Sequence, residues 1–165
     1  MIKYGDFTIL PALEHKDGLR ELFAEYTQML VDNDPVFASY LELQNYDDEI
    51  ENLERKYAPP SGRMFIVFRG SELCGCGGLM RYDDDACELK RMYVRPEFRG
   101  RGLASFLGRL ILDEAKNAGY SYVLLDTLPF LQSAQRLYRR LGFYEIEKYN
   151  DSPMENATYM RYDLR

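Results

Sequence analysis

Apolar residues recur at helical spacing in four stretches of the chain, and this pattern predicts helices over residues 13–31, 47–57, 102–118 and 132–141. In the first stretch the apolar positions that share one helix face are Leu19, Leu22, Phe23, Tyr26 and Leu30. Gly119 is placed to end the third helix in the left-handed conformation, and Gly142 stops the fourth. Proline-containing segments at residues 32–35 and 59–62 end the first and second helices.

Short apolar runs between these helices predict strands over residues 7–10, 64–68, 73–82, 87–94, 122–125, 143–147 and 157–162. The run at 122–125 is continuously apolar, as expected for a strand covered on both faces. The predicted order is one strand, two helices, three strands, a helix, a strand, a helix and two strands. This order favours an α/β fold of the mixed α+β kind, with a mixed sheet covered by helices. Because the chain has 165 residues and no linker, we expect residues 1–165 to form one domain.

Composition and charge indicate the compartment in which the protein works and the kinds of partner that it binds. No apolar run approaches the roughly 20 residues of a membrane span, and residues 1–6 lack the apolar stretch of a secretory signal. A cytoplasmic protein with no membrane partner is therefore expected. The net charge of −6, with a single histidine, argues against nucleic acid as a partner and suits a cationic acceptor such as an amine better.

The three cysteines raise the question of a metal or redox site, because Cys74 and Cys76 are separated by one glycine. The only histidine, His15, lies far away in the sequence, and structural zinc sites need four ligands at recognisable spacing. An odd number of cysteines without a secretory signal fits reduced thiols. We therefore expect Cys74, Cys76 and Cys87 to be core residues and predict no metal.

The segment from Glu88 to Ala104 holds the most informative pattern. It has the pattern of a strand, a tight turn rich in glycine and arginine, and the start of a helix. Gly100 and Gly102 allow unusual backbone dihedrals and close ligand approach, and free N–H groups at a helix start attract phosphate. Arg99 and Arg101 can add positive charge there. The loop is neither Gly-x-Gly-x-x-Gly nor a Walker sequence, which argues against dinucleotides and nucleoside triphosphates. Taken alone, it leaves open an ordinary strand–helix connection.

Two motifs in this half of the chain resemble those of one known family. Arg99-x-x-Gly102-x-Ala104 matches the Arg/Gln-x-x-Gly-x-Gly/Ala signature of the GNAT acetyltransferases, and residues 88–96 resemble that family's fourth strand and the loop after it. About forty residues later, residues 134–143 resemble its second signature, Ala-x-x-Leu-Tyr-x-x-x-Gly-Phe. The predicted element order is also the family's order, so the resemblance spans nearly the whole chain.

This resemblance implies a GNAT-type acyl-CoA N-acyltransferase fold: a mostly antiparallel mixed sheet with helices on both faces, in which the parallel strands at residues 88–94 and 122–125 splay apart. It implies acetyl-CoA as co-substrate, its pantetheine arm pairing with the backbone of Met92 and Val94. The N–H of Met92 or Tyr93 would polarise the thioester carbonyl. The pyrophosphate would lie against the backbone of Arg99, Gly100, Arg101, Gly102, Leu103, Ala104 and Ser105. Leu131 departs from the family, many members of which carry asparagine there.

The expected reaction is direct attack of a neutral amine on the thioester. A lysine-like amine with a pKa near 10.4 must lose a proton at a cost of about 4.6 kcal/mol at pH 7. Glu88, at the start of the strand lining the cleft, is the candidate base, acting directly or through water. The alternative interpretations are that Glu88 is a solvated residue at the end of a strand, or that it pairs with Arg81 or Lys90. Tyr138 is the candidate acid that protonates the leaving thiolate. The alternative interpretation is that Tyr138 is simply an aromatic residue of the core.

The acceptor is not specified by either motif. Similar proteins use the loop between the first two helices and the C-terminal tail, here residues 31–46 and 149–160. These segments carry Asp32, Asp34, Tyr40, Tyr46, Tyr149, Asn150 and Tyr159. A small-molecule amine is the first expectation. Acetylation of protein N-termini or lysines, and a non-catalytic CoA-binding regulatory role, remain alternatives. Family members often dimerise, so a homodimer also stays open.

Overall fold

The computed structural model describes residues 1–165, and its strands form one eight-stranded sheet in the order β1-β2-β3-β4-β5-β6-β8-β7. All neighbouring strands are antiparallel except β5 and β6, which are parallel. The predicted mixed, mostly antiparallel sheet is therefore confirmed. The strands are β1 Ile2–Tyr4, β2 Phe7–Pro11, β3 Arg63–Arg69, β4 Glu72–Arg81, β5 Ala86–Val94, β6 Tyr122–Thr127, β7 Tyr144–Ile146 and β8 Thr158–Asp163.

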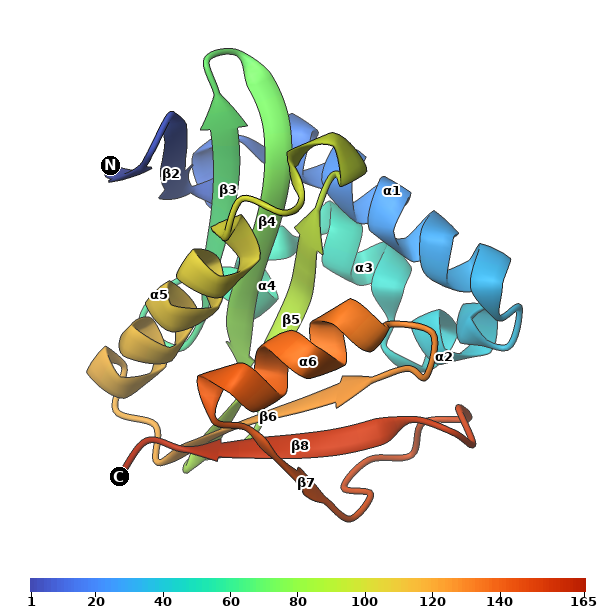
Figure 1. The fold of residues 1–165 in the computed structure, drawn as a ribbon. Helices are drawn as coiled ribbons and strands as arrows, with labels where there is room; N and C mark the ends of the chain where they lie inside the picture. The colour runs from blue at the N-terminus through green and yellow to red at the C-terminus, as the bar shows by residue number, and fades with distance from the viewer.

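Helices cover both faces of the sheet (Figure 1). On one face lie α5 (Leu103–Asn117) and α6 (Gln132–Leu141), and on the other lie α1 (Lys16–Asn33), α3 (Tyr46–Glu51) and α4 (Leu53–Tyr57). The sheet thus separates two buried clusters. One contains Leu107 and Ile111 of α5, and the other contains Leu22 and Phe23 of α1. No helix has both the length and the apolar character needed to cross a membrane.

The structure differs from the predicted elements in three places. β1 is too short to show a pattern, and a turn with Gly5 at φ +59° folds it back onto β2. The predicted loop at 31–46 contains α2 (Phe37–Leu43), whose buried Phe37 and Tyr40 pack in a small cluster with Leu128. The helix predicted over 47–57 is divided into α3 and α4, because Asn52 leaves the helical region at φ −126°.

Cys74 and Cys76 lie on opposite faces of the sheet. A register shift between β3 and β4 after Val67 turns Cys74 toward the α5 cluster, whereas Cys76 joins the α1 cluster. Both side chains and that of Cys87 are fully buried and unpaired. Burial raises the pKa of the Cys76 thiol well above its usual range. The interpretation of all three as core residues is confirmed.

The parallel pair separates soon after it begins. Only Ala86, Cys87 and Glu88 of β5 pair with β6, opposite Tyr122, Val123 and Leu124. Beyond Glu88, β5 continues alongside β4, while β6 continues alongside β8 and crosses β5 at a steep angle (Figure 1). Residues 89–94 and 125–127 therefore face each other unpaired, and the splayed pair implied by the family resemblance is confirmed.

A bulge in β5 lies at this opening. The β4–β5 register shifts between Cys76 and Gly78, and Arg91 adopts φ +58°. Such a left-handed conformation costs a non-glycine residue about 1–2 kcal/mol. The Arg91 guanidinium donates to both carboxylate oxygens of Glu49 on α3, at 2.9 and 3.0 Å. Glu49 also accepts from Lys56 at 2.8 Å and from the Tyr57 hydroxyl at 2.9 Å, so it ties α3 and α4 to the bulge.

Replacing Glu49 by glutamine should lower the free energy of unfolding by about 3–5 kcal/mol at pH 7, because Arg91 would be left buried without its counter-ion. Burial alone would raise the pKa of Glu49, but Arg91 and Lys56 outweigh it and lower that pKa from 4.5 to about 2. The stabilisation, about 3 kcal/mol, should be fully present above pH 4.5 and lost as the pH falls toward 2. Urea unfolding between pH 3 and 7 measures both effects.

The matched control is the double variant Glu49→Leu with Arg91→Met, which removes both charges and should recover much of the lost stability. Equal stability of Glu49→Gln and the parent protein at pH 7 would show that the ion pair does not hold the bulge.

Candidate active site

Two cavities meet where β5 and β6 diverge. The larger, about 530 Å³, lies between the end of β5, the N-terminus of α5 and α6. The smaller, about 40 Å³, lies between β5, β6 and α2. The residues that line both are Tyr26, Met92, Asp126, Thr127, Leu131 and Tyr138. The two cavities therefore adjoin each other along these six residues.

The larger cavity ends at a loop suited to bind an anion. Gly100 and Gly102 both have φ +79°, which glycine adopts without strain. The backbone N–H groups of residues 100–105 donate to no other backbone group. They precede and begin α5, whose dipole adds partial positive charge at this end. The loop therefore presents several free donors to the cavity.

Gly102 is required for a further reason that the sequence does not show. A Cβ at this position would lie 2.5 Å from the Tyr4 hydroxyl, so it would point at β1. That hydroxyl donates to the Arg101 carbonyl at 2.9 Å and holds the loop against β1. Gly102 therefore has two structural effects: its left-handed backbone shapes the loop beside the cavity, and its missing side chain makes room for Tyr4.

The arginines of the loop have different positions. Arg99 lines the larger cavity, and its Nε donates to the Val94 carbonyl at 2.8 Å. The Arg101 guanidinium lies over the Phe7 ring, 5.9 Å from its centroid, and its side chain lines neither cavity. Arg140 of α6 lines the larger cavity and adds a second cation there. Sequence reasoning missed Arg140 because the helix that carries it is distant along the chain from the glycine-rich loop.

The open edge of β5 presents backbone groups to the larger cavity. The Arg95 N–H donates to the Cys74 carbonyl of β4 at 2.8 Å. Because backbone groups alternate between the two edges of a strand, the Tyr93 N–H also faces β4, and those of Met92 and Val94 face the open edge. Of the two N–H groups considered for the thioester carbonyl, the one on Met92 is therefore accessible.

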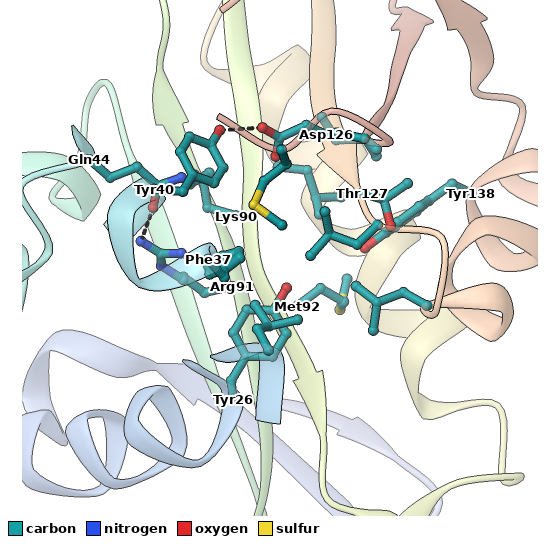
Figure 2. A pocket seen from close by; sticks show the side chains of 17 residues that line it. Tyr26, Phe37, Tyr40, Gln44, Lys90, Arg91, Met92, Asp126, Thr127 and Tyr138 are labelled. Atoms are coloured by element: carbon teal, nitrogen blue, oxygen red, sulfur yellow. Dashed lines mark hydrogen bonds between the residues drawn. The ribbon is translucent and has the colours of Figure 1, made fainter. Parts of the chain in front are cut away.

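The smaller cavity is bounded by a hydrogen-bonded network (Figure 2). The Tyr40 hydroxyl and the Asn150 amide both donate to Asp126 Oδ2, the latter at 3.0 Å. Asn150 also contacts the Tyr40 hydroxyl at 3.1 Å and accepts from Tyr159 at 3.1 Å. Burial, with the nearby Asp126 carboxylate, raises the pKa of Tyr40 well above its usual range. Tyr40 therefore stays protonated and donates to Asp126.

Glu88 is buried and lies just outside this cavity. Its Oε2 accepts from the Tyr149 hydroxyl at 2.8 Å, and its side chain lines neither cavity. Burial and the Glu88 carboxylate raise the pKa of Tyr149, so the tyrosine donates this hydrogen bond. The other suggested partners do not engage Glu88, since Arg81 pairs with Asp84 and Lys90 forms no ion pair.

Tyr138 and Thr127 lie at the boundary between the two cavities. The Tyr138 hydroxyl makes no hydrogen bond to the protein, and burial raises its pKa well above the usual value. Thr127 is buried, and its Oγ1 has no hydrogen-bond partner. An unpaired buried hydroxyl costs about 1–3 kcal/mol, so a hydrogen bond from a group that enters the cavities would stabilise Thr127.

Comparisons with known proteins agree with this geometry. Residues 17–143 match the model of the acetyltransferase (GNAT) family. An uncharacterized N-acetyltransferase of Schizosaccharomyces pombe is 39% identical over 151 residues, covering 90% of this chain and 88% of that protein.

This chain belongs to the GNAT acetyltransferase family. The GNAT chain is also 34% identical over 125 residues to the N-acetylaspartate synthetase of Danio rerio, covering 74% of this chain and 44% of that protein. The crystal structure of the PaiA N-acetyltransferase of Thermoplasma acidophilum, in complex with coenzyme A, superposes with a TM-score of 0.70 at 16% identity. That alignment covers 95% of this chain and 98% of the PaiA chain, so the two share the GNAT fold.

The acceptor residues suggested from sequence divide into two groups in this GNAT protein. Tyr40, Tyr149, Asn150 and Tyr159 belong to the polar network around Glu88 and Asp126. The others are engaged elsewhere: Asp32 accepts from Gln28, Asp34 accepts from the Val36 N–H, and Tyr46 lies over the Arg91 guanidinium.

Asp126 and Thr127 were missed by sequence reasoning, although both come directly after the apolar run at 122–125. Ligands commonly bind beyond the carboxyl ends of parallel strands, and that position was the available signal. Leu131, the departure from the family pattern, lines both cavities as an apolar side chain.

Replacing Thr127 by valine should raise the free energy of unfolding of the ligand-free protein by about 1 kcal/mol, since it removes an unpaired buried hydroxyl at nearly constant volume. The midpoint of thermal unfolding should rise by roughly 2–4 °C. Scanning calorimetry measures the shift, and Thr158→Val, on the paired strand, serves as the matched control. A lower midpoint for Thr127→Val would show that its hydroxyl already has a partner.

Proposed function

We propose that this GNAT protein binds acetyl-CoA in the larger cavity and transfers the acetyl group to the primary amine of a small molecule in the smaller one. The observation that carries the proposal is the junction of the two cavities, which Met92, Asp126, Thr127 and Tyr138 surround. The larger cavity supplies the anion-binding loop that a pyrophosphate needs, and the coenzyme A complex of the PaiA enzyme supports this assignment.

The loop at residues 100–105 suits the pyrophosphate in charge and geometry. Each hydrogen bond to a charged group contributes about 1.5–3 kcal/mol, so three or four N–H donors are enough to bind it firmly. The free edge of β5 at Met92 and Val94 suits the amide groups of the pantetheine arm. Acetyl-CoA supplies the thioester whose acyl group is transferred.

Two groups at the junction stabilise the charges that develop. The Met92 N–H points to the open edge and donates to the thioester carbonyl oxygen, which becomes negative during attack. The Tyr138 hydroxyl donates to the sulfur that leaves. Because burial raises the pKa of Tyr138, a hydrogen bond to the thiolate is favoured over complete proton transfer.

Two carboxylates on the same side of the sheet serve as bases for the proton that the amine loses. Asp126 lines the smaller cavity and has Oδ1 free of side-chain hydrogen bonds. Glu88 lies behind it with Oε1 free, and it acts through an intervening water. For an amine with a pKa near 10.4, deprotonation at pH 7 costs about 4.6 kcal/mol, so this pair is needed most when the amine is strongly basic.

The size of the smaller cavity supports a small acceptor. At about 40 Å³ it has room for roughly three water-sized groups. Tyr40 of α2 and Met154 of the segment before β8 line it and pack in one small cluster, which suits a compact acceptor. The name of the N-acetylaspartate synthetase relative, which describes an acetylated small amine, points the same way.

Calorimetric titration with acetyl-CoA and thiol release with a panel of small primary amines test the proposal together. Micromolar acetyl-CoA binding and turnover of at least one small amine are expected. Ala104→Glu should weaken acetyl-CoA binding at least tenfold, since it places a carboxylate beside the phosphates, and the effect should shrink at high salt.

Asn117→Asp at the far end of α5 adds the same charge outside the cavity, and its affinity should equal that of the parent protein. Unchanged acetyl-CoA affinity in Ala104→Glu would disprove the loop assignment. Turnover with lysine-containing peptides but with no small amine would reject the small-molecule acceptor.

Replacing either carboxylate should lower activity in a way that depends on pH, whereas replacing Tyr138 should lower it equally at every pH. Asp126→Asn should lower kcat/KM on the order of 10²-fold and Glu88→Gln about tenfold, both most strongly at low pH, where more of the amine is protonated. Tyr138→Phe should lower kcat about 10²-fold equally from pH 6 to 9, because its raised pKa keeps the hydroxyl protonated throughout.

Steady-state kinetics across this pH range measures all three variants, with acetyl-CoA affinity as the check on folding. Unchanged turnover in Glu88→Gln would remove Glu88 from the mechanism, and the same result for Asp126→Asn would remove Asp126.

A further inference from the structure

Three charged side chains line the smaller cavity, and only one lacks a partner. Arg91 is bound to both oxygens of Glu49, and Asp126 accepts from Tyr40 and Asn150. The Lys90 ammonium makes no hydrogen bond and no ion pair, although the residue is only 8% exposed. Figure 2 shows Lys90 among the side chains that line the cavity.

Strand alternation before the β5 bulge explains why Lys90 lies there. Leu89 packs in the α5 cluster, so Lys90, the next residue, points to the opposite face, where Glu88 and Asp126 also lie. Burial lowers the pKa of Lys90, Arg91 lowers it further, and the carboxylates of Glu88 and Asp126 offset part of this. An ammonium on the wall of a mostly buried cavity keeps little water around it, so an anion that binds there stabilises it.

We propose that Lys90 binds a carboxylate of the acceptor, so that the substrate of this acetyltransferase is a small amino acid. The inference rests on the proposed function and names the substrate class of the same site. Lys90, Met92 and Tyr138 all line the smaller cavity. A short amino acid can therefore present its amine to the junction at Met92 and Tyr138 while its carboxylate reaches Lys90.

Matched acceptors test this directly. Glycine, β-alanine, L-alanine, L-aspartate and L-glutamate are compared with their carboxamides, which keep the amine and lose a carboxylate. We expect kcat/KM to be about ten- to a hundredfold higher for at least one amino acid than for its amide. An amine beside an amide is less basic, with a pKa near 8, so this bias favours the amide and works against the expected result.

Lys90→Met should raise KM for the amino acid about ten- to a hundredfold, leave the amide almost unchanged and leave acetyl-CoA affinity intact. Lys90→Arg keeps the charge and should retain the preference for the carboxylate. Lys116→Met, an exposed position on α5, is the control and should behave as the parent protein. A thermal shift with the preferred amino acid in the presence of CoA should appear in the parent protein and vanish in Lys90→Met, independently of turnover.

Equal rates for amino acids and amides in the parent protein would overturn the inference while leaving the proposed acetyl transfer in place. It would also be overturned if Lys90→Met kept the carboxylate preference and changed only the pH profile, since Lys90 would then act as a proton acceptor. Acetyl-CoA binding without turnover or thermal shift for any small amine would instead reject the proposed small-molecule function.

Discussion

The buried ion pair between Arg91 and Glu49 is the interaction on which the site depends. Arg91 occupies a left-handed conformation that its side chain does not favour, and the carboxylate of α3 holds it there through two hydrogen bonds. The resulting bulge turns Arg91 to the side of the sheet that α2 and α3 cover, which Lys90 already faces by strand alternation, while Met92 turns its backbone to the open edge. This local irregularity thus determines where the Arg91 side chain and the Met92 backbone lie beside the two cavities.

The divergence of β5 and β6 has consequences on both faces of the sheet. On the α5 and α6 face, it leaves a strand edge unpaired beside the glycine-rich loop, and the larger cavity forms between them. On the other face, α2 and the segment after β7 close over the gap and contribute Tyr40, Tyr149 and Asn150. Three segments that are far apart in sequence thereby meet around Asp126 and Glu88.

Sequence reasoning performs well where signals are local. Gly119 and Gly142 are predicted as helix ends, and both adopt positive φ. The glycine-rich loop is predicted as an anion site, and its positive-φ glycines and free N–H groups fit that prediction. Sequence reasoning performs less well where position depends on contacts between distant elements. The helix-breaking segment at residues 32–35 hides α2 from the sequence pattern, because the apolar residues of α2 pack with distant residues such as Leu128 and Met154. Likewise, nothing near Glu49 in the sequence indicates that its partner is Arg91.

The sequence by itself determined the alternation of elements, the strand–loop–helix segment and the family to which the chain belongs, because hydrophobic period, capping glycines and short motifs act over a few neighbouring residues. Only the tertiary structure decided which charges are paired and which face a cavity. Lys90 and Arg91 are adjacent cations in the sequence, and nothing local tells them apart. Glu49 of α3 pairs with Arg91, whereas the Lys90 ammonium faces the smaller cavity without an ion pair. Burial makes this difference matter, because it removes the water that would otherwise solvate both charges.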